Sequence, residues 1–112
     1  MIISDTPSPV IVAPEIASIS LSVFVYGQSE NNLKRAISAM ETGLFEESLK
    51  HLNYALNDDP KNAQVHKLRA LLYEALEKEE KAIRAWNDCI RYSKDQNMIK
   101  EAKIHLDYLN GI

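Results

Sequence analysis

Residue types on which enzyme and metal chemistry depend are scarce in this sequence. Cys89 is the only cysteine among 112 residues, so an internal disulfide is excluded and nothing favours an oxidising compartment. The three glycines stand too far apart to form a phosphate-binding loop, and no serine lies in a Gly-x-Ser-x-Gly motif. The histidines are too dispersed for a metal ligand set, and each is expected at the surface or half-buried on a helix. We expect no catalytic activity, no cofactor and no metal.

Basic residues are missing from the first part of the chain. The first is Lys34, and residues 1–28 carry only Asp5 and Glu15. A secretory signal begins with basic residues, so none is predicted, and the apolar stretch 16–26 is shorter than the roughly 20 residues of a membrane span. The net charge of −3 offers no basic stripe for nucleic acid. We expect a cytoplasmic protein without a membrane span.

Residues 1–28 are predicted to form an extended apolar arm. Three prolines lie within residues 1–14 and favour an extended backbone. Residues 19–26 alternate with a period of two and are rich in β-branched and aromatic side chains, which favours a strand. Apolar residues of 16–26 also share one helical face, so a helix stays open as the alternative.

One stretch of the sequence matches a later stretch at a fixed offset, which we call the repeat offset. The matching positions are Ala36 with Ala70, Ile37 with Leu71, Ala39 with Tyr73, Ser48 with Ala82, Leu49 with Ile83, Leu52 with Trp86, Ala55 with Cys89, and Leu56 with Ile90. A constant offset of about 34 residues predicts a repeated unit, and its size fits a helix–turn–helix hairpin.

These residues, with Gly43, Phe45 and Pro60, resemble the tetratricopeptide repeat (TPR) family. The resemblance covers residues 29–96, with repeats over 29–62 and 63–96. It implies an all-α fold, a short α-solenoid in which residues 29–112 form one TPR-like domain after the arm. It also implies a protein–protein interaction scaffold or adaptor that holds another polypeptide in a concave groove.

The chain departs from the family pattern at several positions. In the second repeat Glu77 and Lys94 replace the usual glycine and proline. Arg35 and Arg69 stand where the family buries leucine, so each should reach solvent or a carboxylate. The candidate carboxylate partners are Glu30, Glu41 and Glu74.

Caps and periodicity predict helices over residues 30–42, 45–57, 63–76, 79–93 and 96–110. Ser29, Asn62 and Asp95 are expected to cap helix starts, and Gly43 should end the first helix in the left-handed conformation. The helix at 96–110 is interpreted as a capping helix that closes the C-terminal side of the repeats.

Most aromatic side chains are expected to pack rather than bind a ligand. Phe45, Tyr73 and Trp86 should be core residues, Cys89 should pack in a tight helix crossing, and Tyr54 should be exposed. The charge run 77–81 should form a solvated face with i, i+4 pairs, which are Glu77 with Lys81 and Glu80 with Arg84.

An apolar groove is the predicted binding site. Candidate partner-binding residues are Leu33, Ile37, Met40, Lys67, Leu68, Leu71, Glu74 and Tyr108, with Lys67 and Glu74 at the rim, and Ala102, His105 and Leu109 are expected on the same groove surface. One branch of the family clamps a C-terminal carboxylate with lysine and asparagine. Those positions hold Leu33, Ile37 and Leu68 here, so the chain does not resemble that branch.

The arm is expected to mediate self-association. About three stacked hairpins are needed to bury their apolar faces, and the N-terminal side of the first repeat is open. Burial of the arm against one surface gains roughly what ordering its backbone costs, so a second subunit should cover it. The candidate residues are Ile19, Leu21, Val23 and Val25, and the expected assembly is a homodimer. The alternative function is an obligate subunit or assembly factor whose arm adds a strand to a larger complex.

Overall fold

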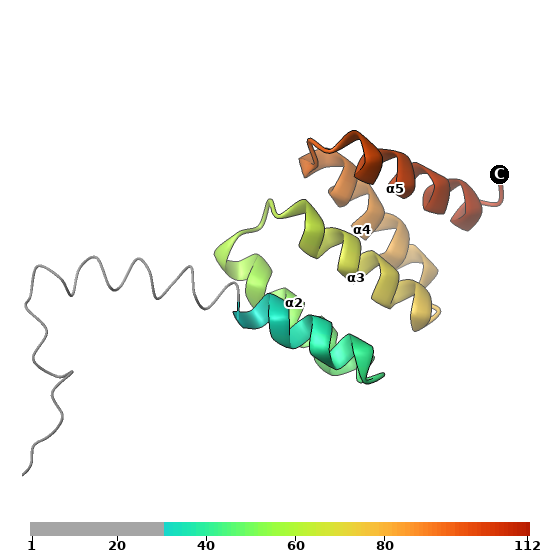
Figure 1. Ribbon diagram of the computed structural model, residues 1–112. Helices are drawn as coiled ribbons and strands as arrows, with labels where there is room; N and C mark the ends of the chain where they lie inside the picture. Colours follow the sequence, from blue (N-terminus) through green and yellow to red (C-terminus); the bar gives the residue numbers. More distant parts are fainter. Residues whose placement is uncertain (1–30) are drawn as a thin grey trace, which may run out of the picture.

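The computed structural model describes residues 31–112, and all regular structure in that span is helical (Figure 1). Residues 31–41 are helical, and they are followed by α2 (Phe45–Asp58), α3 (Ala63–Ala75), α4 (Glu79–Tyr92) and α5 (Gln96–Leu109). No helix within 31–112 combines the length and the apolar character that crossing a membrane requires. The predicted arm lies outside the described residues, and so does the segment 16–26, for which both a strand and a helix were considered.

Polar caps start two of these helices where the sequence predicted them. The Asn62 side chain accepts hydrogen bonds from the backbone N–H groups of Gln64 at 3.0 Å and Val65 at 3.3 Å. At α5, the Asp95 carboxylate accepts from the Asn97 N–H at 2.9 Å. Each bond satisfies a first-turn donor that the helix itself leaves unpaired.

One backbone turn recurs at the ends of three helices, at positions related by the repeat offset. Gly43, Glu77 and Gly111 have φ values of +82°, +59° and +78°. After each of them, the next N–H bonds to the carbonyl five residues earlier at 2.8 Å, which is the Schellman pattern. Glu77 therefore adopts the left-handed conformation of the glycine that it replaces, at an energetic cost that a glycine would not incur.

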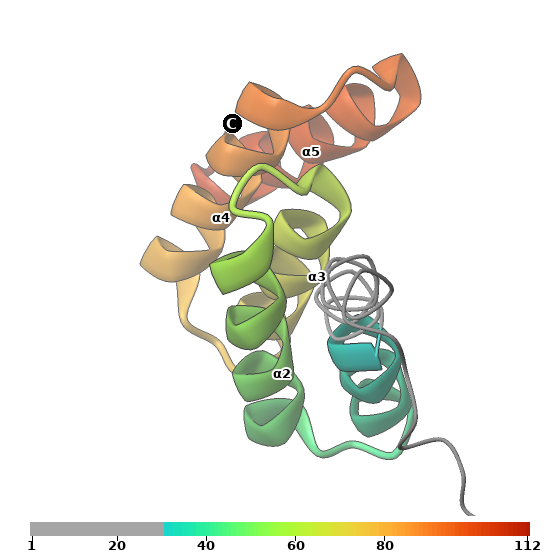
Figure 2. The same ribbon diagram turned by 90° about the vertical axis from the view of Figure 1, so that its left-hand side faces the viewer.

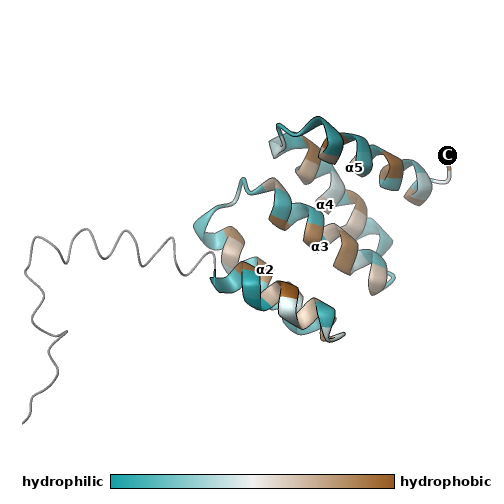
Figure 3. Ribbon diagram, in the orientation of Figure 1, coloured by the Kyte–Doolittle hydropathy of each residue, from teal (hydrophilic) through white to brown (hydrophobic). Residues whose placement is uncertain are grey.

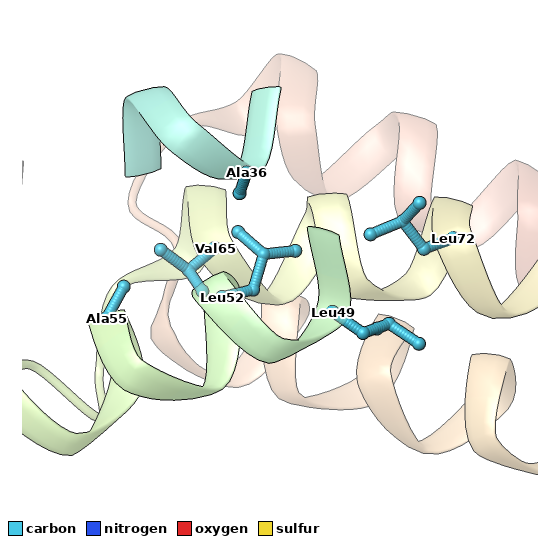
Figure 4. Close-up of a cluster of buried hydrophobic side chains, with 6 residues drawn as sticks. All are labelled: Ala36, Leu49, Leu52, Ala55, Val65 and Leu72. Carbon is cyan, nitrogen blue, oxygen red and sulfur yellow. The ribbon is translucent and has the colours of Figure 1, made fainter. Parts of the chain in front are cut away.

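Consecutive helices pack antiparallel, and α3 makes its most extensive contacts with α4 (Figures 1 and 2). Hydrophobic and hydrophilic residues are interspersed along each helix (Figure 3), as expected for amphipathic helices that bury one face. Six side chains from the segment 31–41, α2 and α3 form a first core cluster (Figure 4): Ala36, Leu49, Leu52, Ala55, Val65 and Leu72. A second cluster joins α3, α4 and α5: Ala70, Ala85, Trp86, Cys89 and Ala102.

Several positions related by the repeat offset are buried alike in the two repeats. Ala36 and Ala70 are at most 1% exposed, Leu52 and Trp86 are fully buried, and so is Cys89, as its predicted packing role requires. Ser48 and its equivalent alanine in the second repeat are also fully buried. Small residues at these positions let paired helices approach closely. In the first repeat, the segment 31–41 and α2 lie close enough for the Ser48 hydroxyl to donate a hydrogen bond to the Ala36 carbonyl at 2.6 Å.

Two expectations about polar residues are wrong in detail. His66 is only 5% exposed rather than half-buried, because its ring stacks on Tyr92 and its Nε2 lies 2.9 Å from the Pro60 carbonyl oxygen. The charge run 77–81 is exposed as expected, but neither of its i, i+4 ion pairs forms. Glu77 lies in the turn before α4, so its spacing to later residues is not helical.

Candidate functional site

Neighbouring helices cover most of the surface of α3, and the part that they leave uncovered is open to solvent. Leu68 and Leu72 belong to the first core cluster with α2, and Ala70 belongs to the second with α4 and α5. At 3.6 residues per turn, the remaining arc of α3 holds Gln64, Leu71 and Ala75, of which Leu71 also packs partly against the second cluster. Leu71 is half-buried and Ala75 is exposed, so this arc faces solvent between the side contacts.

Two polar contacts join α3 to α5. Lys67 Nζ lies 2.9 Å from Glu101 Oε1, and Glu74 Oε2 lies 2.8 Å from His105 Nδ1. A carboxylate only accepts hydrogen bonds, so His105 Nδ1 carries the proton of this contact. The two contacts occur in the same order along both helices, which means that α3 and α5 run parallel. We call these four residues the α3–α5 seam.

Glu74 is the most constrained member of the seam. Its Oε2 also accepts a 2.6 Å hydrogen bond from the Trp86 indole N–H, and the His105 ring stacks on Trp86 with centroids 4.5 Å apart. One carboxylate of α3 therefore fixes side chains of both α4 and α5. Charge-assisted bonds of this kind are about twice as strong as neutral ones. The seam holds the outer surfaces of α3 and α5 in a fixed relation.

The open arcs of α3 and α5 lie on the same side of this seam. On α5, Ala102 packs in the second cluster, and Leu106 and Leu109 pack against it. Proceeding around the helix from that core side, the seam residues come next, followed by Tyr108 and then by Ile104, which lies almost opposite the core. Around the axis of α3 the residues also follow the order core, seam and open arc, but in the opposite direction of rotation from α5. Because the helices are parallel, opposite senses place the two arcs side by side, facing away from α4.

The segment 31–41 continues this surface. Ile37 is the repeat equivalent of Leu71 and is half-buried, and it is not among the side chains packed on the first cluster. We call Ile37, Leu71, Ala75 and Tyr108 the open face. It is apolar at every one of these positions, and the charged seam runs beside it.

The structure places the predicted partner-binding residues in three settings. Ile37 and Tyr108 lie on the open face, Leu71 lies on it while also packing partly against the second core cluster, and Lys67 and Glu74 lie beside it in the seam. Leu33, Met40 and Leu68 are half-buried and pack against the first core cluster. Of the other α5 residues expected on the groove, Ala102 is fully buried and Leu109 packs beside it, so both are core residues instead.

The last helix packs over the second core cluster, and its own outer face is exposed. Ile104 is 62% exposed, although its repeat equivalent Ala70 is fully buried. Tyr108 and Ile112 are 79% and 89% exposed. Ala70 is covered by α4 and α5, whereas no helix follows α5 within residues 31–112. The outer face of α5 therefore presents an apolar stripe to solvent.

Side chains with chemical reactivity are buried or dispersed in the described residues. Burial raises the pKa of the Cys89 thiol above its usual value, although the charge of Lys67 acts in the opposite direction. The thiol is therefore protonated at neutral pH and a poor nucleophile. Within residues 31–112, no three histidine, cysteine or acidic side chains are grouped as metal ligands.

Sequence reasoning missed the seam partner Glu101 and the apolar Ile104. Neither carries a signal in its own helix, because their roles depend on the rotation of α5 against α3. Comparison with known proteins adds no assignment: no protein-family model, curated protein or solved structure matches the chain.

Proposed function

We propose that residues 29–112 form a TPR-like solenoid whose open face is a concave groove for another polypeptide. Two observations support the solenoid: the burial of Ala36, Ala70 and the other positions related by the repeat offset, and the left-handed turns at 43, 77 and 111. The function proposed is that of a non-catalytic scaffold or adaptor. Its partner is an apolar segment, bound as an amphipathic helix or an extended peptide.

The observation that carries this proposal is the apolar open face beside a fixed polar seam. Apolar side chains at Ile37, Leu71 and Tyr108 are spread over three helices, where they bury surface only if another chain covers them. Each covered side chain of this size contributes roughly 1.5–3 kcal/mol. The seam keeps α3 and α5 from shifting, which lowers the ordering cost that binding would otherwise incur.

A peptide selection tests the proposal. Phage-displayed helical peptides are selected on the full chain, and the winners are measured against Ile37→Ala, Leu71→Ala and the control Tyr54→Ala. Tyr54 is 47% exposed on α2, away from the open face. Selected peptides should lose at least tenfold in affinity on the first two variants and nothing on the control. Equal binding to all three variants, or core-sized stability losses at Ile37 and Leu71, would contradict the proposal.

A second candidate function is an obligate subunit of a larger assembly. The exposed stripe of Ile104, Tyr108 and Ile112 favours it, because a surface that apolar is usually covered by a neighbour. In this alternative the arm, through residues such as Val23 and Val25, joins copies of the chain or adds a strand to a partner. Light scattering of the full chain and of a variant starting at residue 29 separates the cases. A dimer that becomes monomeric without the arm supports the alternative, and a monomer in both excludes arm-mediated dimers.

A further inference from the structure

A cavity of about 280 Å³ between α3 and α4 gathers basic side chains in a chain whose net charge is −3. Its lining residues are Arg69, Tyr73, Lys81, Arg84, Ala85 and Asp88. Three cations thus face a single carboxylate. The cavity shares no residue with the open face or the α3–α5 seam, so it constitutes a separate site.

Arg69 is held in place at this cavity without a counter-ion among residues 31–112. Its guanidinium lies 5.5 Å from the centre of the Tyr73 ring, and Nη2 donates to the Tyr73 hydroxyl at 3.4 Å. Nη1 lies 3.5 Å from His66 Nδ1, and Nε is buried without a hydrogen-bond partner in the described part of the chain. Glu74, an expected partner, bonds to Trp86 and His105 instead. An arginine fixed in this way loses little freedom when it binds an anion.

The other two cations are also without acidic partners. Within residues 31–112, no carboxylate oxygen lies within 4.0 Å of a side-chain nitrogen of Lys81 or Arg84. Lys81 Nζ lies 5.9 Å from the centre of the same Tyr73 ring that Arg69 covers. Two like charges this near the same ring repel each other, and a bound anion would offset that repulsion.

We propose that this cavity binds an anionic side chain of a partner polypeptide, phosphorylated or carboxylic, with Arg69 as its principal contact. Its lining of three basic side chains and one carboxylate suits a single anionic side chain. The acidic balance of the chain disfavours nucleic acid and anionic lipid, which need an extended basic surface.

The first repeat provides a matched control for this site. Another cavity, of about 440 Å³, lies at the equivalent place and is lined by Arg35, Glu47 and His51 among others. Arg35 is the repeat equivalent of Arg69, but Glu47 stands at the position that Lys81 occupies in the second repeat. The mixed charges at Arg35 give no net attraction for an anion, so the same fold position is present there without the basic cluster.

An NMR titration of the full chain tests the proposal with three short peptides that differ only in a central phosphoserine, glutamate or serine. The phosphoserine and glutamate peptides should shift the signals of Arg69 and Tyr73, and the serine peptide should not. A stronger response to phosphoserine assigns the site to phosphorylated partners, and an equal response assigns it to acidic ones. Binding of all three peptides alike, or of a uridine oligonucleotide of equal charge more tightly than the peptides, would overturn the proposal.

Four variants identify the residues responsible. Arg69→Gln should weaken binding of the anionic peptides about tenfold, while Arg35→Gln changes it less than twofold. The exposed pair Lys81→Gln/Arg84→Gln should weaken binding similarly without disturbing the fold, since neither side chain is buried. Asp88→Asn removes the one acid that lines the cavity and should tighten binding severalfold. Wild-type affinity in both the Arg69 variant and the exposed pair refutes the site. A loss of binding confined to variants of the open face also refutes it, because the peptide would then bind at the open face.

Discussion

Glu77 occupies a backbone conformation that favours glycine, and its replacement should stabilise the fold. Its φ of +59° places a side chain in the left-handed region, which costs an L-residue roughly 1–2 kcal/mol. A glycine there removes that strain but adds freedom to the unfolded chain, at a cost of roughly 0.5–1 kcal/mol. The net gain for Glu77→Gly is about 0.5–1 kcal/mol, equivalent to about 2–8 °C in Tm for a domain of this size.

Gly43 supplies the opposite substitution at the equivalent turn. Its φ is +82°, and a Cβ built there meets no atom within 4 Å, so Gly43→Ala tests backbone strain without a steric clash. We expect a loss of about 0.5–1 kcal/mol, the mirror image of the gain at Glu77. Glu77→Gln is the control for charge, since it keeps the side chain and the strained backbone, and it should stay within about 0.5 kcal/mol of the wild type.

Urea unfolding followed by Trp86 fluorescence measures all three variants on one scale. Trp86 is the only tryptophan and is fully buried, so its emission reports loss of the core. If Glu77→Gly is neutral or destabilising while Gly43→Ala is destabilising, the left-handed turn at 77 is not strained and the reasoning fails. A gain in Glu77→Gln as large as in Glu77→Gly would assign the effect to charge.

Three further predictions concern buried and paired side chains. Ser48→Ala should cost about 1 kcal/mol in urea unfolding, because it deletes the buried bond to the Ala36 carbonyl; no loss would show that alanine suffices, as at the equivalent position of the second repeat. Cys89 should resist a thiol reagent until the chain unfolds, and rapid labelling of the native protein would disprove its burial. Because burial raises the pKa of this thiol in the fold, its contribution to stability should persist below the usual thiol pKa and decline at higher pH. A double-mutant cycle on Lys67 and Glu101 should give a coupling of at most about 1 kcal/mol, since both side chains are partly exposed, and a much larger coupling would mean that the seam is more desolvated than the structure shows.

Helix positions and core packing were predictable from the sequence because they depend on local signals. Asn62 and Asp95 cap helices where the pattern of polar and apolar residues begins. The repeat offset likewise identified Trp86 and Cys89 as core residues from their counterparts in the first repeat. Each of these inferences compares a residue with its own helix or with its repeat equivalent.

The candidate site depends on relations between helices that no local pattern reports. Glu74 was expected as a partner of Arg69, five residues away on the same helix, yet it bonds to Trp86 on α4 and His105 on α5. The exposure of Ile104 follows from the absence of a following helix within the described residues, although its repeat equivalent is buried. The rotation of α5 relative to α3 decides both the partners of Glu74 and the exposure of Ile104, and packing of the whole bundle fixes that rotation.

The central claim is that the open face binds a polypeptide. Mapping amide chemical-shift changes on the full chain with a selected peptide tests it most directly. The largest changes are expected around Ile37, Leu71 and Tyr108, spread over the three helices that carry the open face. Changes confined to the outer surface of α2 and α4 would contradict it.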